Sequence, residues 1–183
     1  MTRQATLQTE RMTLRQLRAS DAGMIAHYAG DERVARMTTT LPHPMPHGAA
    51  EMFIERSSHR TRTETSWVMD ASKIDGPEVI GVISVEHGVE PSEEVGYWVG
   101  PPFWNTGYGT EALRAVIQHR FEEGVPRLVG IVFQDNPQSA KVLTHCGFRY
   151  IGDEEGYSVA RKSTVAQWRY ELTEAQWTAL AAS

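Results

Sequence analysis

The stretch EVGYWVGPPFWNTGYGTEALRAVIQHRFEEG, residues 94–124, decides the fold. It begins as a strand, is broken by two prolines, passes through two glycines and continues into an amphipathic segment with these apolar positions at helical spacing: Leu113, Val116, Ile117 and Phe121. Gly124 is placed to end that helix. Gly107 and Gly109 directly precede the helix, so their N–H groups and the helix N-terminus should face one concavity that favours an anion. A plain strand-to-helix turn with two glycines is the alternative.

The string GYGTEA, residues 107–112, also matches the G-x-G-x-x-G/A dinucleotide fingerprint. That fingerprint follows the first strand of a doubly wound sheet at once, whereas here PPFWNT intervenes and three predicted strands come earlier. Too little chain remains for a second nucleotide-binding half, and Asp135 lies farther on than the usual separation of about 20 residues. A nicotinamide-dependent enzyme is therefore the least favoured of the three functional hypotheses that the sequence suggests.

The whole chain, 1–183, is predicted to form one domain of α/β (α+β) class. We expect one opening strand with an irregularity, a helix capped by Ser20 or Asp21, an extended proline loop, a second helix and three antiparallel strands. The expected segments are 7–17, 22–37, 41–48, 49–62, 66–72, 78–89 and 93–100, with turns at 73–77 and 90–92. After the opening stretch we expect strand 127–135, helix 137–146, a strand at 149–152, a variable loop, strand 166–172 and a closing turn capped by Thr173 and Gln176.

Composition excludes several classes of function. With 18 Lys+Arg against 23 Asp+Glu the net charge is -5, and no basic block occurs, so neither nucleic acid nor an anionic membrane is an expected partner. The one cysteine, Cys146, reads as a small buried residue, and the absence of a signal-like N-terminus favours a soluble cytoplasmic protein. His43 and His47 do not have metal-site spacing, so no metal is expected.

The string WNTGYG, residues 104–109, resembles the Q/R-x-x-G-x-G/A pyrophosphate loop of the GNAT superfamily of acetyl-CoA-dependent N-acetyltransferases, with Trp104 where glutamine or arginine is usual. The branch of ribosomal-protein alanine and serine N-terminal acetyltransferases is resembled in five ordered segments: 7–17, 41–44, 95–113, 135–148 and 170–177. The resemblance implies a mixed, mostly antiparallel sheet of about seven strands, flanked by helices. In it a central parallel pair, at 96–100 and 128–133, splays apart to admit the cofactor.

The resemblance also implies the residues that bind acetyl-CoA. The main chain of Trp98 and Val99 would contact the pantetheine arm, and Asn136 would reach its amides. The loop around the pyrophosphate would comprise Trp104, Thr106, Gly107, Tyr108, Gly109 and Thr110. Ser139 belongs to the same site, and Lys141 would meet a phosphate, although a solvated helix lysine is the simpler reading.

Acetyl transfer to an amine needs a base for the nitrogen and a proton for the departing thiolate. Glu94, where the central strands should diverge, is the preferred base; Glu86, Glu154 and Glu155 are the alternatives, and Ser158 could occupy the family's matching place. Many family members protonate the thiolate with a tyrosine at the position of Leu143, and the resemblance offers Ser139 as the replacement. The alternative for Ser139 is a purely structural role in the first helical turn.

The leading hypothesis is an N-acetyltransferase that moves an acetyl group from acetyl-CoA to a primary amine by direct attack in a ternary complex. The acceptor would be a protein N-terminal α-amino group or a small-molecule amine, and the fold does not choose between them. A non-catalytic coenzyme A-binding sensor or scaffold is the alternative, suggested by the missing tyrosine. Monomer and homodimer are both left open.

Overall fold

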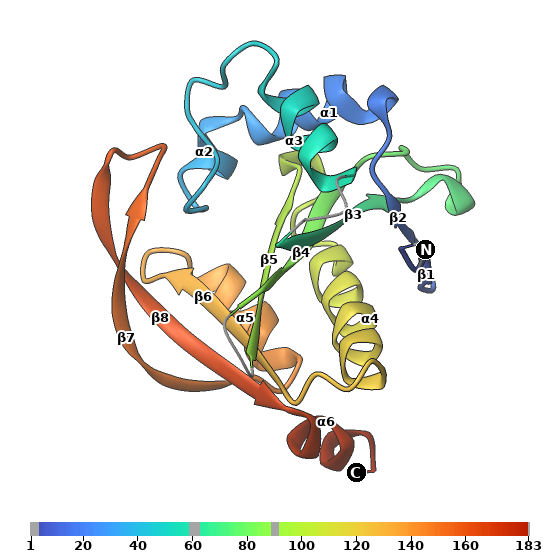
Figure 1. Cartoon of the computed structure of the whole chain (residues 1–183), viewed down its shortest axis with the longest axis vertical. Helices are drawn as coiled ribbons and strands as arrows, with labels where there is room; N and C mark the ends of the chain where they lie inside the picture. The colour runs from blue at the N-terminus through green and yellow to red at the C-terminus, as the bar shows by residue number, and fades with distance from the viewer. Residues whose placement is uncertain (1–3, 59–62, 89–91, 183) are drawn as a thin grey trace.

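The computed structural model describes residues 4–58, 63–88 and 92–182, and these fold around one mixed sheet of eight strands (Figure 1). In spatial order the strands are β1 (Leu7–Gln8), β2 (Thr13–Gln16), β3 (Glu64–Asp70), β4 (Gly81–His87), β5 (Ser92–Val99), β6 (Arg127–Phe133), β8 (Ser163–Thr173) and β7 (Arg149–Ser158). All neighbouring pairs are antiparallel except β5 and β6. The meander predicted from short turns is therefore confirmed in β3, β4 and β5.

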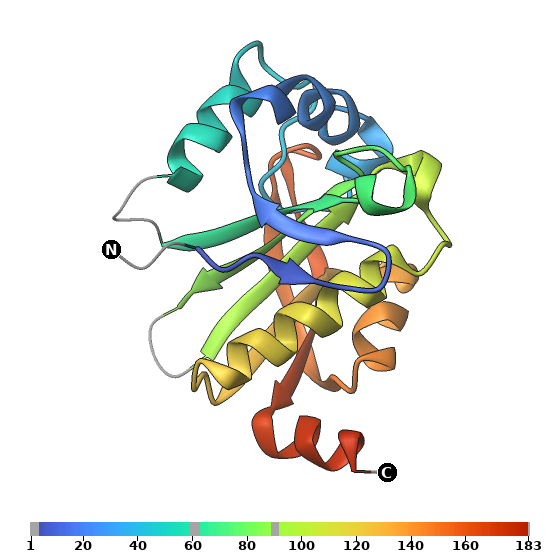
Figure 2. The same cartoon turned by 90° about the vertical axis from the view of Figure 1, so that its right-hand side faces the viewer.

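Six helices accompany the sheet in the described ranges: α1 (Ala22–Ala29), α2 (Glu32–Ala35), α3 (Ala49–Ser58), α4 (Tyr108–Glu122), α5 (Pro137–His145) and α6 (Glu174–Ala181). The helices α1, α2 and α3 gather at one end of the molecule and α6 lies at the other (Figures 1 and 2). Over these ranges no helix is both long and apolar enough to cross a membrane.

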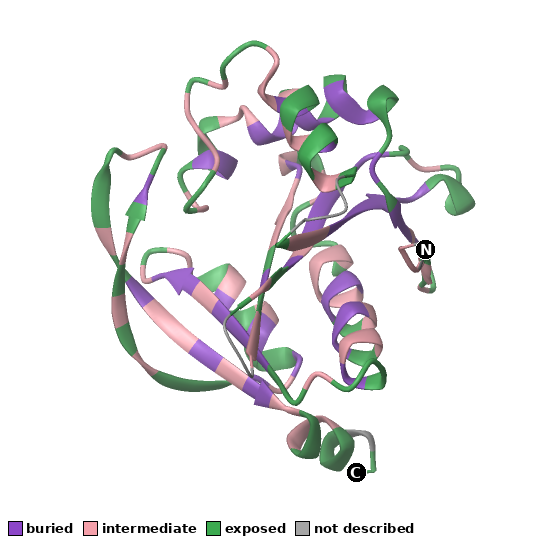
Figure 3. Cartoon of the chain, in the orientation of Figure 1, coloured by how far each residue is buried: buried purple, intermediate pink, exposed green. Residues whose placement is uncertain are grey.

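The core has two parts because the sheet is covered on both faces. The larger part contains the apolar side of α4 and α5 and the strand residues beneath them, including Leu113, Ile117 and Leu128, each fully buried. The smaller part joins α1 and α3 to β3 and β4 through Ile25, Ile54 and neighbours. Figure 3 shows the buried positions along the inward side of α4 and in the central strands. The helical spacing of the opening stretch thus identified a real core face.

The central parallel pair is short, as the resemblance implied. β5 and β6 pair at Ser92–Arg127, Glu93–Leu128 and Glu94–Val129, and beyond Glu94 the two strands no longer pair. β5 continues to Val99 with only β4 as its partner, while β6 continues beside β8. Beyond Glu94, the inner edges of the two strands therefore do not pair with each other and can offer main-chain groups to a ligand; the Val99 carbonyl already accepts from Trp104.

Several predicted elements need correction. The opening strand is two strands, β1 and β2, which pair with each other, so the sheet has eight strands rather than about seven. The predicted helix at 22–37 is broken at Gly30, because Asp31 caps a new short helix with its side chain. The supposed variable loop after 152 is strand, since β7 and β8 form one long hairpin. The last four residues of the segment 49–62, and most of the turn at 90–92, lie outside the described residues.

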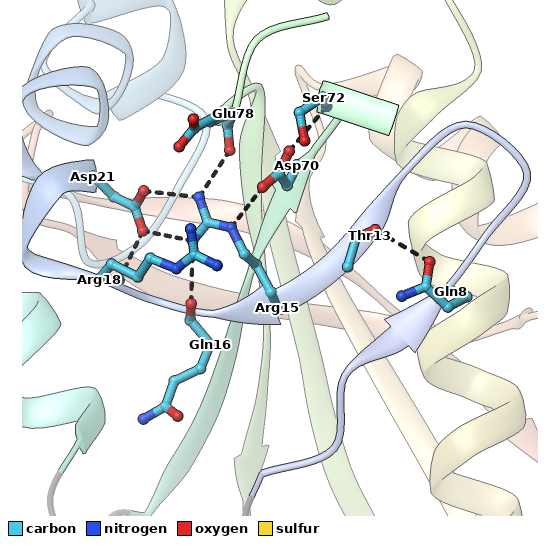
Figure 4. A network of polar contacts seen from close by, with 9 residues as sticks. All are labelled: Gln8, Thr13, Arg15, Gln16, Arg18, Asp21, Asp70, Ser72 and Glu78. Atoms are coloured by element: carbon cyan, nitrogen blue, oxygen red, sulfur yellow. Dashed lines mark hydrogen bonds and ion pairs between the residues drawn. The ribbon is translucent and has the colours of Figure 1, made fainter. Parts of the chain in front are cut away.

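A buried ion cluster anchors β2 to β3 and to the start of α1 (Figure 4). The Arg15 guanidinium donates to Asp70 at 2.6 Å and to both carboxylate oxygens of Asp21 at 2.9 Å. Asp21 therefore does not cap α1 with its side chain, as the sequence suggested, but pairs with Arg15 instead. All three residues are at most 6% exposed. A buried charge cluster of this kind is stable only while every member keeps its partner.

Candidate active site

A cavity of about 880 Å³ opens where β5 and β6 separate. Its walls come from β3, β4 and β5 on one side, β6 and β8 on the other, and the segment 37–57 above them. Residues from the start of α5, Asn136 and Ser139, line it as well. The predicted proline loop contributes Pro42, Pro46 and His47 to the cavity wall.

Main-chain alternation along β5 decides which residues face the gap. Gly100 donates its N–H to Ile80 on the β4 side at 2.8 Å. In an antiparallel ladder such groups alternate, so Trp98 also directs its main-chain groups toward β4, while Tyr97 and Val99 direct theirs toward the gap. Of the two residues whose main chain was expected to contact the pantetheine arm, Trp98 therefore faces β4 and Val99 faces the gap. The Trp98 side chain instead lines the cavity.

The glycine loop leads directly into α4. Gly107 is the N-cap residue with φ 84°, a left-handed conformation that favours glycine, and it offers no side-chain cap. The first N–H groups of α4, at Tyr108, Gly109 and Thr110, therefore have no side-chain partner among the described residues. Gly109 is different, because a Cβ there would make ordinary contacts of 3.6 Å or more with Tyr97 and Val99. The conformation of the loop requires glycine at 107 but not at 109.

Arg11, which the sequence reasoning did not single out, ties the β1–β2 turn to this loop. Its Nε donates to Glu111 at 2.7 Å, and Nη1 donates to the Thr106 carbonyl at 2.9 Å. The guanidinium also stacks on the Tyr108 ring, 4.3 Å from its centroid. Glu111 accepts two more bonds, from the Thr9 hydroxyl and the Arg11 main-chain N–H. The loop is thus braced from outside by a half-exposed cation.

Trp104, the departure from the family pattern, has a definite place after the proline break. Its indole N–H donates to the Val99 carbonyl at 2.7 Å, and Arg33 lies 5.6 Å from the ring centroid. The ring is 41% exposed. Trp104 therefore holds the end of β5 against the loop, which is a positioning contact that an aliphatic residue could not make.

The start of α5 brings Asn136 and Ser139 together. Asn136 accepts from the Ser139 N–H through Oδ1 and donates from Nδ2 to the Ser139 hydroxyl at 3.0 Å. The Tyr97 hydroxyl, from β5, donates to the Ser139 carbonyl at 3.4 Å, and burial raises the pKa of this phenol. Leu143 fills the position of the usual tyrosine and is fully buried against Gly130. Lys141 is exposed on α5 and does not line the cavity.

Glu94 is the last β5 residue that pairs with β6, and its side chain lines the cavity. Although Glu94 is exposed to solvent, desolvation by the protein around its carboxyl and then the nearby Glu86 charge raise its pKa, with Arg169 opposing them. A carboxyl of raised pKa next to the gap is suited to accept a proton near neutral pH.

The other carboxylate candidates fall in different places. Glu86 faces Glu94 across the β4–β5 ladder and lines the cavity too. Glu154 pairs with Arg169 at 3.2 Å, and Glu155 is exposed on β7 and absent from the cavity lining. Ser158 is fully buried and accepts from the Arg161 N–H. Within the part of the chain that is described, no group of His, Cys, Asp and Glu is arranged to hold a metal ion.

Comparison with known proteins agrees with this architecture. The sequence profile of the family described as "Acetyltransferase (GNAT) domain" matches residues 11–149. Among curated relatives, N-acetyltransferase p20 of Bacillus licheniformis is 24% identical over 180 residues, covering 94% of this chain and 98% of the relative. The ribosomal-protein-serine acetyltransferase of Escherichia coli (strain K12) is 39% identical over 75 residues, 39% of this chain and 41% of that protein.

A solved structure shows the same fold. The microcin C7 self-immunity acetyltransferase MccE, determined in complex with acetyl-CoA and AMP, superposes with a TM-score of 0.75 at 19% identity, covering 90% of this chain and 93% of that chain. The overall fold of this chain is therefore shared with that structure.

Proposed function

The chain is a member of the GNAT acetyltransferase family, and we propose that it transfers the acetyl group of acetyl-CoA to a primary amine bound in the cavity between β5 and β6. The amine is a protein N-terminal α-amino group or a small molecule. The name of the Escherichia coli relative, a ribosomal-protein-serine acetyltransferase, favours the first of these.

The features around the gap fit acetyl-CoA. The uncapped start of α4, with Gly107 in its left-handed conformation, offers N–H groups to a pyrophosphate. The inner edge of β5 offers the main-chain groups of Tyr97 and the Val99 N–H to the amides of the pantetheine arm, while the Val99 carbonyl already accepts from Trp104. Asn136 lies on the opposite side of the gap, where its amide can reach the same arm. These groups come from three elements that meet only at the split.

The reaction itself needs two proton movements. In a ternary complex the amine nitrogen attacks the thioester carbon, a C–N bond forms, the C–S bond breaks and the thiolate leaves with the electron pair. Glu94 takes the proton that the nitrogen loses, directly or through one water. The Ser139 hydroxyl, held by Asn136 Nδ2, donates to the sulfur or positions a water that does so. The Tyr97 hydroxyl, which donates to the Ser139 carbonyl, stays protonated because burial raises the pKa of its phenol.

The observation that carries this proposal is the separation of β5 from β6 directly after Glu94. Glu94 lines the cavity where the two strands part, and the uncapped α4 N-terminus approaches the far end of the same β5 segment, at Tyr97 and Val99.

Calorimetric titration with acetyl-CoA, followed by thiol release in a screen of peptides and amines, tests the proposal. Micromolar or tighter binding and acceptor-dependent thiol release are expected. Binding without release for any acceptor would favour the coenzyme A-binding sensor, which Leu143 at the tyrosine position suggests. A folded protein that binds no acetyl-CoA would contradict both functions.

A further inference from the structure

Three glutamates form a row across the floor of the cavity. Glu64 on β3 lies opposite Glu86 on β4, and Glu86 lies opposite Glu94 on β5. All three line the cavity, and the next row along the same face, Ser66, Ser84 and Gly96, is polar or bare. Neighbouring strands are about 4.8 Å apart, so the row extends about 10 Å from Glu94 to Glu64.

The row is not neutralised by the parts of the chain that are described. None of its carboxylates forms an ion pair there; Glu64 accepts a hydrogen bond from the Ser66 hydroxyl. By contrast, the adjacent Glu93, on the other face of β5, is bound by Arg120 through two bonds of 2.8 and 2.9 Å. Like charges placed directly opposite each other destabilise a sheet. The sequence nevertheless keeps three such carboxylates side by side on the cavity face.

The cations around the cavity do not cancel the row. Arg56 on α3 and His47 in the preceding proline loop line the cavity, and among the described residues neither forms an ion pair with the row. Arg169 lowers the pKa of Glu94 through its charge but is itself paired with Glu154. The carboxylates therefore keep a negative floor beneath the site of reaction.

A second observation on the opposite wall also points to a ligand. Gln167 of β8 is only 3% exposed and lines the cavity, and its side-chain amide has no hydrogen-bond partner in the ranges that the structure covers. Among the described residues, every side-chain N or O atom that is completely buried has a hydrogen-bond partner. Because the Gln167 amide has none, its polar atoms must retain a small accessible surface. The amide packs directly over Gly156, where a Cβ would lie 2.4 Å from its oxygen. An unpaired, buried amide beside a cavity is a group prepared for a polar ligand.

We propose that the acceptor is a multiply charged cation: in addition to the amine that is acetylated, it carries a second protonated amine or guanidinium about 5 to 10 Å away. Glu64 and Glu86 hold the second charge while the reacting nitrogen lies at Glu94. The Gln167 carbonyl oxygen accepts a hydrogen bond from the acceptor on the other wall. This inference rests on the proposed acetyltransferase function and gives it a substrate class. A linear diamine or polyamine and a peptide with a basic residue next to its α-amino group share this chemistry.

The test compares acceptors that differ only in the second charge. Diaminobutane and diaminopentane are matched with butylamine and pentylamine, and peptides with lysine or arginine at the second position are matched with the corresponding norleucine peptides. Thiol release with saturating acetyl-CoA gives kcat/KM for each acceptor. The doubly charged member of a pair is expected to be favoured about tenfold. The amine arm or the peptide arm, whichever is faster, identifies the source of the cation.

Variants then assign the preference to the row. In Glu64→Gln/Glu86→Gln the ratio between the charged and uncharged acceptors should fall to near one, mainly through KM for the acceptor, with KM for acetyl-CoA unchanged. Gln167→Leu should raise KM for every acceptor. Glu123→Gln, at the far end of α4, removes one charge elsewhere and should leave the ratio as it is. Circular dichroism confirms that each variant is folded.

Equal rates within each matched pair, or an unchanged ratio in the double variant, would overturn the inference. If acetyl-CoA binds but no acceptor releases thiol, the proposed function fails, and calorimetry with coenzyme A present then decides the inference alone. Tighter binding of diaminobutane than of butylamine, lost in the double variant, would still support it; equal binding would refute it.

Discussion

Glu94 and Val129 are the last residues at which β5 and β6 face each other as partners. Beyond that pair β5 continues to Val99 without β6 as a partner, the cavity opens between the two strands, and the loop before α4 follows at the end of β5. Glu94 has two roles here: its main chain forms the last pair between β5 and β6, and its side chain lines the cavity. The following predictions test that arrangement.

Replacing Glu94 with glutamine should lower kcat/KM about 100-fold or more, the effect of removing a general base. A base works only when ionised, and the pKa of Glu94 is raised, so wild-type activity should rise with pH through a value above that of an ordinary glutamate. The variant should lack this limb of the pH profile. Steady-state rates across the acid range measure it, and a matching loss in Glu154→Gln instead would move the role to that residue.

The two loop glycines should respond differently to alanine. Gly107→Ala places a Cβ at φ 84°, which costs about 1–2 kcal/mol and should weaken acetyl-CoA binding by distorting the cradle. Gly109→Ala adds a methyl group with ordinary contacts and should keep the free energy of unfolding within about 0.5 kcal/mol. Urea unfolding and calorimetry give both quantities. Equal destabilisation at the two sites would show that φ is not the deciding factor.

Arg11→Met should raise the Kd for acetyl-CoA several-fold, since the loop loses its brace to Thr106 and Glu111. The acceptor KM at saturating acetyl-CoA should hardly change. Arg11→Lys keeps the charge but cannot reproduce the forked contact, so it should behave like Arg11→Met rather than like wild type. A fully restored Kd in the lysine variant would mean that charge alone is sufficient.

Ser139→Ala should lower kcat about tenfold to 100-fold if its hydroxyl serves the leaving thiolate. The KM for the acceptor should be unaffected, because the Asn136 cap to the Ser139 N–H remains. Pre-steady-state thiol release isolates this step. An unchanged kcat would support the structural role in the first turn of α5 and would direct attention to Tyr97.

Arg15→Met should destabilise the fold by about 3–5 kcal/mol, because Asp21 and Asp70 would remain buried without their cation. Arg33→Met, which removes an exposed pair with Asp31, should cost less than about 1 kcal/mol. Urea unfolding compares the two. A loss of under 1 kcal/mol in Arg15→Met would show that the cluster contributes little.

The buried cluster of Arg15, Asp21 and Asp70 also affects how the free energy of unfolding changes at acid pH. Burial favours the neutral form of Asp70, but hydrogen bonds from Ser72 and Arg15 outweigh it and lower its pKa. A depressed pKa means that the stabilisation is complete above the unfolded-state value of about 3.9 and is lost as pH falls through the folded-state value. Stability measured against pH should therefore fall more steeply at the acid end in wild type than in Asp70→Asn.

Local patterns in the sequence were sufficient for the parts of the fold that depend on local chemistry. The apolar spacing after Gly109 gave α4, and Thr173 with Gln176 forms the predicted capping box of α6. The β7–β8 hairpin was not recognised because its first strand, RYIGDEEGYS, has three consecutive acidic residues between two glycines and no alternating apolar face. It is strand because β8 supplies a partner along its length.

The candidate site was predictable to a similar degree. The loop and Glu94 follow from motif and position along one strand. The Glu64–Glu86–Glu94 row does not, because it depends on the exact register between neighbouring strands, and Gln167 is brought to the cavity by β8, which is far from β5 in the chain. Arg11 escaped notice for the same reason, as its partner Glu111 is 100 residues away.

The split in the sheet has a consequence for the lifetime of the protein. Its two parts are joined directly at three described residue pairs, so a pantetheine arm in the gap would supply contacts that the chain lacks. A ligand that binds only the native state raises apparent stability with its concentration. Proteolysis that depends on transient opening should then slow when acetyl-CoA is abundant and quicken when it is scarce. The amount of folded protein would thus depend on the acetyl-CoA concentration itself.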